Sequence, residues 1–158
     1  MGTGKTTAGL LAANRLNIPF LDTDAAIEKK MGLTVAQIFS KKGETVFRIL
    51  ERQMILSTRH SSPQVVALGG GVVLSQGNRD VLWQGIWINL NTDIPAILKR
   101  VGDKKTRPML RKKASRESVE TLLKARLPYY RLAPYQVETG SLSPDAVADD
   151  ILKIARKI

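Results

Sequence analysis

The first residues constrain this chain most, because they combine glycine, lysine and threonine in the order of a phosphate-binding loop. The segment reads Gly2-Thr3-Gly4-Lys5-Thr6-Thr7 and runs directly into a predicted helix that ends at Leu16. Glycines let backbone N–H groups converge on phosphate oxygens, and a helix start adds further donors and the positive end of its dipole. Lys5 can reach the β- and γ-phosphates of a nucleotide, and the Thr6 hydroxyl can bind Mg²⁺. The alternative is a flexible N-terminus without a ligand, against which the immediate helix argues.

The full pattern of such a loop, G-x-x-x-x-G-K-[ST], starts earlier than this sequence does. Its first glycine would lie two positions before Met1, and the strand that feeds the loop would come before that glycine. We therefore expect this N-terminal strand and the first glycine of the loop to be absent from the sequence. Either the native chain starts earlier, or another segment fills the place of the strand.

The length predicts one domain over residues 1–158, or one domain with a mobile insert, and the alternation of strands and helices described below indicates an α/β domain. The hydrophobic share of 43% is sufficient for a single core. There is no long apolar run and no secretory signal, so we expect a cytoplasmic protein without a membrane partner. The absence of cysteine excludes disulfides, thiolate metal sites and cysteine nucleophiles, and the single histidine, His60, excludes a site of several histidines.

The chain is strongly basic, with a net charge of +11 from 25 basic and 14 acidic residues. Such a surplus attracts polyanions, either nucleic acid or phosphorylated metabolites. Much of it lies between Lys99 and Arg131, where Tyr129 and Tyr130 are the only aromatic residues. This is no stacking platform for bases, so we expect small anionic ligands and no nucleic acid.

Two aspartates follow the short strand predicted over residues 18–21, in the order Asp22-Thr23-Asp24. Ligands of open α/β sheets bind beyond the carboxyl ends of the strands. One carboxylate can hold Mg²⁺ and the other can accept a hydrogen bond from a substrate hydroxyl. The alternative is that Asp24 only caps the next helix.

A second candidate group combines an arginine with a run of glycines. Arg48 and Glu51 lie three residues apart on a helix predicted over residues 44–60. They form either a surface ion pair, which contributes little, or a site in which Arg48 offers its planar fork to a substrate carboxylate. The strand predicted over residues 64–68 runs into Gly69-Gly70-Gly71, where a ligand can approach the backbone closely.

The basic segment over residues 102–115 shows little periodicity and resembles a mobile lid, which would carry an arginine over the transferred phosphate. The alternative is a solvated basic loop. Before and after this segment, strands alternate with helices. The last helix has Ser143 as its cap and Pro144 in its first turn. This alternation predicts a three-layer sandwich, in which helices flank a parallel sheet.

Taken together, the chain resembles shikimate kinase, a P-loop kinase related to the nucleoside monophosphate kinases. Order and spacing agree over nearly the whole chain. The matching stretches are G-T-G-K-T-T at the start, L-D-T-D at residues 21–24, F-R-x-x-E at 47–51, L-G-G-G at 68–71, R-P-M-L at 107–110 and A-R-L-P-Y-Y at 125–130.

The resemblance implies a role for each matching residue. Residues 2–7 would hold the ATP phosphates, with Lys5, Asp24 and Arg107 as catalytic residues. Thr6 and Asp22 would bind Mg²⁺, while Arg100, Arg107 and Pro144 would contact the nucleotide. Shikimate would lie on a helical region of about residues 24–60, and its contacts would be Asp24, Arg48, Gly69, Gly70, Gly71 and Arg126.

The implied activity is transfer of the ATP γ-phosphate to the 3-hydroxyl of shikimate, a step of chorismate and aromatic amino acid biosynthesis. The resemblance implies a monomer with ATP and shikimate as its partners. Two alternatives stay open. One is another small-molecule P-loop kinase, such as a gluconate kinase, and the other is a non-catalytic module that binds nucleotide or RNA.

Overall fold

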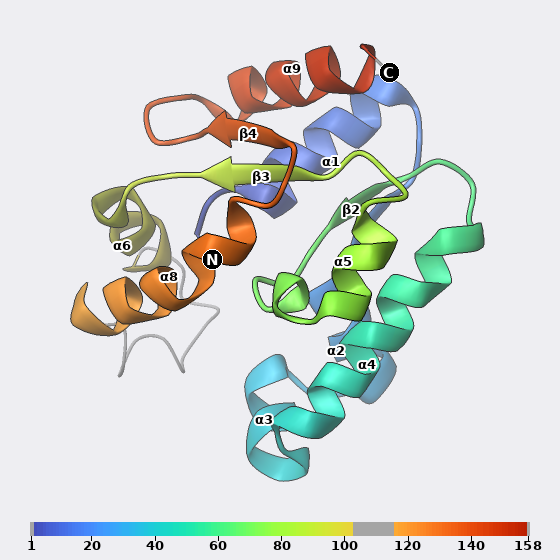
Figure 1. The fold of residues 1–158 in the computed structure, drawn as a ribbon, viewed down its shortest axis with the longest axis vertical. Coiled ribbons are helices and arrows are strands. Elements are labelled where there is room, and N and C mark those ends of the chain that lie inside the picture. The colour runs from blue at the N-terminus through green and yellow to red at the C-terminus, as the bar shows by residue number, and fades with distance from the viewer. Residues whose placement is uncertain (1, 103–115, 158) are drawn as a thin grey trace. The chain divides into compact units, whose positions relative to one another are not determined.

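The computed structural model describes residues 2–102 and 116–157, without the side chains of residues 100–102, and is drawn in Figure 1. Its contacts divide the chain into two compact units. One unit holds Gly9–Ile86, and the other holds Met1–Ala8 together with Trp87–Ile158. The predicted lid, apart from Gly102, lies outside the described residues. That one domain spans residues 1–158 stays a prediction.

The Gly9–Ile86 unit contains a pair of parallel strands and a group of helices. Strand β1 pairs with β2 so that Asp22 lies beside Ala67. Because the strands are parallel, the Asp22-Thr23-Asp24 segment and the glycine triplet follow at the same edge. The elements are α1 (Lys5–Leu16), whose first turn belongs to the other unit, β1 (Phe20–Asp22), α2 (Thr23–Met31), α3 (Val35–Lys42), α4 (Glu44–Ser57), η1 (Thr58–His60), β2 (Val65–Ala67), η2 (Val72–Leu74) and α5 (Gln76–Leu82).

Local sequence signals explain the helices α2, α3 and α4. Thr34 and Gln37 form a reciprocal capping box at the start of α3. Gly43 separates α3 from α4 with a φ of +86°, which favours glycine. The three helices share one core of Ile27, Ile38 and Phe47, which are all buried. This core holds α4, and with it Arg48, against the elements that follow β1.

The second unit also contains two parallel strands. Strand β3 (Ile88–Asn91) pairs with β4 (Tyr135–Glu138), and the remaining elements are α6 (Ile94–Gly102), α8 (Arg116–Tyr130) and α9 (Pro144–Ala155). Helix α9 packs against β4 (Figure 1), and Ala8, Leu90, Val137 and Val147 form the core. Ser143 caps α9 and Pro144 is its first residue, as the sequence predicts. Among the described residues, no helix combines the length and the apolar character needed to cross a membrane.

Candidate active site

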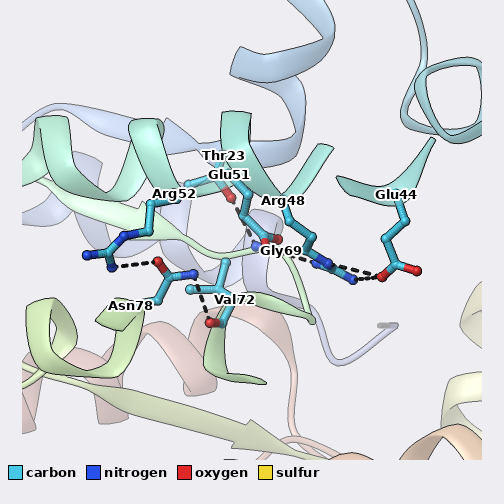
Figure 2. A network of polar contacts seen from close by, with 8 residues as sticks. All are labelled: Thr23, Glu44, Arg48, Glu51, Arg52, Gly69, Val72 and Asn78. Atoms are coloured by element: carbon cyan, nitrogen blue, oxygen red, sulfur yellow. Dashed lines mark hydrogen bonds and ion pairs between the residues drawn. The ribbon is translucent and has the colours of Figure 1, made fainter. Parts of the chain in front are cut away.

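Thr23 connects the segment after β1 to the glycine triplet after β2. Its side chain is fully buried, and its hydroxyl donates to the Ala67 carbonyl at 3.3 Å. The same oxygen accepts the N–H of Gly69 at 3.0 Å, a contact drawn in Figure 2. The hydroxyl thus fixes the backbone at the point where β2 becomes the triplet. Sequence reasoning missed this role, because a threonine between two aspartates does not reveal that its side chain is buried.

The two aspartates have different positions in α2. Asp22 is the N-cap, and its Oδ1 accepts the N–H groups of Asp24 at 3.1 Å and Ala25 at 3.2 Å. The alternative that Asp24 caps this helix is therefore wrong. Asp24 lies in the first turn beside the triplet, since a Cβ added to Gly69 would come within 2.5 Å of its Oδ1. Only glycine leaves room for the Asp24 carboxylate at this place.

Arg48 lies on α4 between two carboxylates (Figure 2). Its Nη1 donates to Glu51 Oε2 at 2.8 Å, and its Nε and Nη2 donate to Glu44 Oε1 at 3.1 and 2.9 Å. A Cβ added to Gly71 would come within 2.2 Å of Nη1, so the guanidinium lies directly over this glycine. The triplet therefore has the Asp24 carboxylate against its first residue and the Arg48 guanidinium against its last.

The pair of Arg48 and Glu51 is not a surface ion pair. The Glu51 side chain is 1% exposed and the Arg48 side chain is 30% exposed. Burial by itself lowers the pKa of Arg48, but the hydrogen bond and charge of Glu51, followed by those of Glu44, outweigh it and raise the pKa above its usual value. Glu51 thus holds a permanently charged guanidinium in one orientation, which sequence spacing alone left open.

A second polar contact supports the segment behind the triplet. Asn78 on α5 is 2% exposed, and its Nδ2 donates to the Val72 carbonyl at 3.1 Å. Arg52 Nη1 donates to Asn78 Oδ1 at 3.2 Å, as Figure 2 shows. These two hydrogen bonds join α4 to the turn η2, which follows Gly71 directly. Nothing in the sequence around Asn78 indicated this role.

The phosphate loop belongs to the other unit. Gly2 and Gly4 adopt φ values of +71° and +91°, which L-residues with a side chain rarely adopt. The Gly4 carbonyl accepts the N–H of Ala8 at 2.9 Å, and α1 begins at Lys5. Thr6 and Thr7 therefore lie in the first turn of a helix. This is the predicted junction of a glycine loop with a helix start.

The other predicted site residues are placed less completely. Gly70 lies between the two glycines that Asp24 and Arg48 approach, and Pro144 begins α9. Arg126 lies on α8, where it lines a small cavity with Ile97, Val119, Leu122, Leu123 and Tyr130. Arg100 belongs to α6 without a described side chain, and Arg107 lies outside the described residues. Arg126 and Arg48 are in different units, so a joint role of these two arginines stays a prediction.

The chemistry of the available donors fits Mg²⁺ that arrives with a nucleotide. Among residues 2–102 and 116–157, there is no group of three acidic, histidine or cysteine side chains that could form a complete metal site. Mg²⁺ in kinases needs no such group, because one or two protein oxygens complement phosphate oxygens and water. Thr6 and Asp22 offer a hydroxyl and a carboxylate of this kind, but they belong to different units, so their joint role in binding Mg²⁺ stays a prediction.

The parallel strands, the glycine loop at a helix start and the charged groups around the triplet define an α/β protein of the P-loop kinase class. The family model "Shikimate kinase" matches residues 1–156, and the chain belongs to the shikimate kinase family. The shikimate kinase of Pelotomaculum thermopropionicum is 40% identical over 99% of this chain and 92% of its own. That of Cereibacter sphaeroides is 40% identical over 94% of this chain and 75% of its own.

Solved structures give the same result. Shikimate kinase from Acinetobacter baumannii, in complex with shikimate, matches with a TM-score of 0.91 and 37% identity over 99% of this chain and 89% of its own. Shikimate kinase from Bacteroides thetaiotaomicron matches with a TM-score of 0.91 and 28% identity, covering 99% of this chain and 94% of that one. These findings confirm the family, the fold class and the ATP-dependent kinase activity that the sequence predicts. The individual site residues stay predictions.

Proposed function

We propose that this chain transfers the γ-phosphate of ATP to the 3-hydroxyl of shikimate, giving shikimate 3-phosphate and ADP. One observation carries the proposal: the glycine triplet has a carboxylate against Gly69 and a guanidinium against Gly71. A substrate with a hydroxyl and a carboxylate needs an acceptor for the first and a two-pronged cation for the second. Asp24 and Arg48 supply these two groups.

In this reaction the 3-hydroxyl oxygen attacks the γ-phosphorus. A new P–O bond forms while the bond from this phosphorus to the β–γ bridging oxygen breaks, and ADP leaves. Asp24 orients the hydroxyl and accepts its proton late in the step. Lys5 and Arg107 compensate the negative charge on the phosphoryl group, so that the protein acts mainly by positioning and charge neutralisation.

The substrate carboxylate binds to Arg48, with Arg126 as the second predicted partner. Glu51 and Glu44 hold the Arg48 guanidinium before the substrate arrives, since they accept from all three of its nitrogens. A group that is already oriented loses less conformational entropy on binding. The backbone of residues 69–71 supplies close contact without side chains.

On the nucleotide side, residues 2–7 hold the phosphates of ATP, while Arg100 and Pro144 flank the adenine. Thr6 and Asp22 would hold Mg²⁺, which when bound screens the charge of the β- and γ-phosphates. Removal of the metal with a chelator should abolish phosphoryl transfer, and added Mg²⁺ should restore it. Activity that persists in excess chelator would contradict this part of the proposal.

Both substrates are anions, which suits the net charge of +11. We expect the chain to act as a monomer in the cytoplasm, without nucleic acid or a membrane as partner. The direct test measures ADP release with shikimate, with gluconate and with a panel of other polyols, and identifies the product by its mass. Phosphorylation of shikimate alone supports the proposal. Turnover of gluconate but not of shikimate would refute it.

A further inference from the structure

Thr139 connects the end of β4 to the phosphate loop. It follows the last residue of β4 and is 1% exposed. Its N–H donates to the Asn91 carbonyl at 2.8 Å, which extends the pairing of β3 and β4 by one residue. Its hydroxyl oxygen lies 2.9 Å from the Asn91 carbonyl and 3.1 Å from the Thr3 carbonyl. Thr3 and Thr139 are 136 residues apart in the sequence.

The hydroxyl has one proton for these two carbonyls. The Asn91 carbonyl already accepts the Thr139 N–H, whereas the Thr3 carbonyl faces the hydroxyl. Donation to Thr3 therefore gives each of the two carbonyls one donor from Thr139, at a contact that is partly buried. On this count of donors we place the hydroxyl proton in the hydrogen bond to the Thr3 carbonyl, although the oxygen lies slightly nearer to the Asn91 carbonyl.

This bond fixes the orientation of the next peptide group. The peptide between Thr3 and Gly4 is trans, as are all the described peptide bonds, so its C=O and N–H point in opposite directions. A carbonyl held by Thr139 on one side directs the Gly4 N–H to the other side. The following peptide group is held as well, because the Gly4 carbonyl accepts a hydrogen bond from the Ala8 N–H at 2.9 Å. The direction of the Gly4 N–H is thus fixed before any ligand binds.

We propose that Thr139 is a positioning residue of the phosphate loop, whose hydroxyl orients the Gly4 N–H towards the phosphates of ATP. The inference rests on the proposed function, because it requires the loop to bind a nucleotide. Loss of the hydroxyl leaves the peptide free to rotate, and nucleotide binding must then supply the ordering. The expected loss is about fivefold to tenfold in nucleotide affinity, the size of one neutral hydrogen bond.

The test compares Thr139→Val with Thr139→Ser in the full chain. Valine keeps the shape of threonine but has no hydroxyl, whereas serine keeps the hydroxyl. We would measure the Kd of ADP by calorimetry, and the KM values for ATP and for shikimate by coupled ADP release. Thr139→Val should weaken ADP binding and raise the ATP KM by the stated factor, while the shikimate KM stays unchanged. Thr139→Ser should restore most of the affinity, and Thr139→Ala replaces the valine variant if that variant does not fold.

Leu152→Ala serves as the control for a merely structural effect. Leu152 is buried on α9 in the same unit, and its truncation destabilises the unit without removing the Thr139 hydroxyl. It should lower the melting temperature and leave ADP binding unchanged below that temperature. The inference is overturned if Thr139→Val binds ADP like the wild type, or if Leu152→Ala weakens binding equally. A wild-type chain that binds no ADP would instead refute the proposed function, and the inference with it.

Discussion

Replacement of Gly71 by alanine tests the position of the Arg48 guanidinium without substituting any charged residue. The new Cβ would lie 2.2 Å from Arg48 Nη1, 2.7 Å from Nη2 and 2.8 Å from Cζ. These distances are too short for contact between non-bonded atoms, so the guanidinium must move. Gly71 has φ −96° and ψ −10°, which alanine adopts without strain. The perturbation is therefore a steric displacement of Arg48 and not a change in the backbone.

The expected loss of stability follows from the interactions that Arg48 would lose on moving. Glu51 is 1% exposed and would lose its 2.8 Å hydrogen bond, which for a charged group contributes about 1.5–3 kcal/mol. Alanine in place of glycine adds about 0.4–1 kcal/mol to the free energy of unfolding, because it restricts the unfolded chain. The net loss of about 1–2 kcal/mol lowers the melting temperature by about 2–8 °C. A lost charged contact to the substrate carboxylate raises the shikimate KM by about ten- to a hundredfold.

Thermal unfolding and coupled ADP release measure these two effects, with Gly85→Ala as the matched control. Apart from its chain neighbours, no heavy atom lies within 4 Å of a Cβ added at Gly85, so this variant should keep the KM and should raise the melting temperature slightly, because alanine restricts the unfolded chain. The double variant with Arg48→Ala isolates the cause. If Gly71→Ala acts only by displacing Arg48, it should raise the KM no further once Arg48 is absent. An unchanged shikimate KM in Gly71→Ala, or full additivity in the double variant, would refute the reasoning.

Three further substitutions separate the parts of the site. Asp24→Asn should reduce turnover severely but leave ADP binding nearly intact, and full turnover would remove Asp24 from the reaction. Arg48→Lys loses the two-pronged fork and should raise the shikimate KM; an unchanged KM would place the substrate carboxylate elsewhere. Asn78→Ala removes the donor to Val72 and the acceptor of Arg52, which should lower the free energy of unfolding by about 1–3 kcal/mol. Chemical denaturation that shows no such loss would contradict the role of Asn78.

The sequence predicts those parts of this fold that local signals determine. Ser143 and Pro144 at the start of α9 appear where expected, and the capping box at Thr34 and the break at Gly43 follow local signals of the same kind. Each rests on interactions between residues only a few positions apart, and such interactions leave a recognisable spacing. The positions of the glycine triplet and of Asp24 after parallel strands follow from the same alternation of strands and helices.

The roles of Thr23, Glu51, Asn78 and Thr139 could not be predicted in this way. Three of them act through hydrogen bonds to backbone groups that tertiary packing brings near, and Thr139 reaches across 136 positions. Glu51 stands at the right spacing from Arg48, but spacing could not distinguish a solvated pair from one in which the carboxylate is buried. Burial is a property of the packed core and not of the helix that carries the residue.

The glycines of this chain show why residue type alone does not reveal a mechanism. Gly4 has a positive φ and no atom within 4 Å of an added Cβ, so glycine is needed there for its backbone freedom. Gly71 has an ordinary backbone but lies under the Arg48 guanidinium, so glycine is needed there for the missing side chain. The first requirement concerns how N–H groups are directed at phosphates, and the second concerns how closely a cation approaches the backbone. A kinase that binds two anions in different ways therefore uses the same residue type, glycine, for two distinct physical reasons.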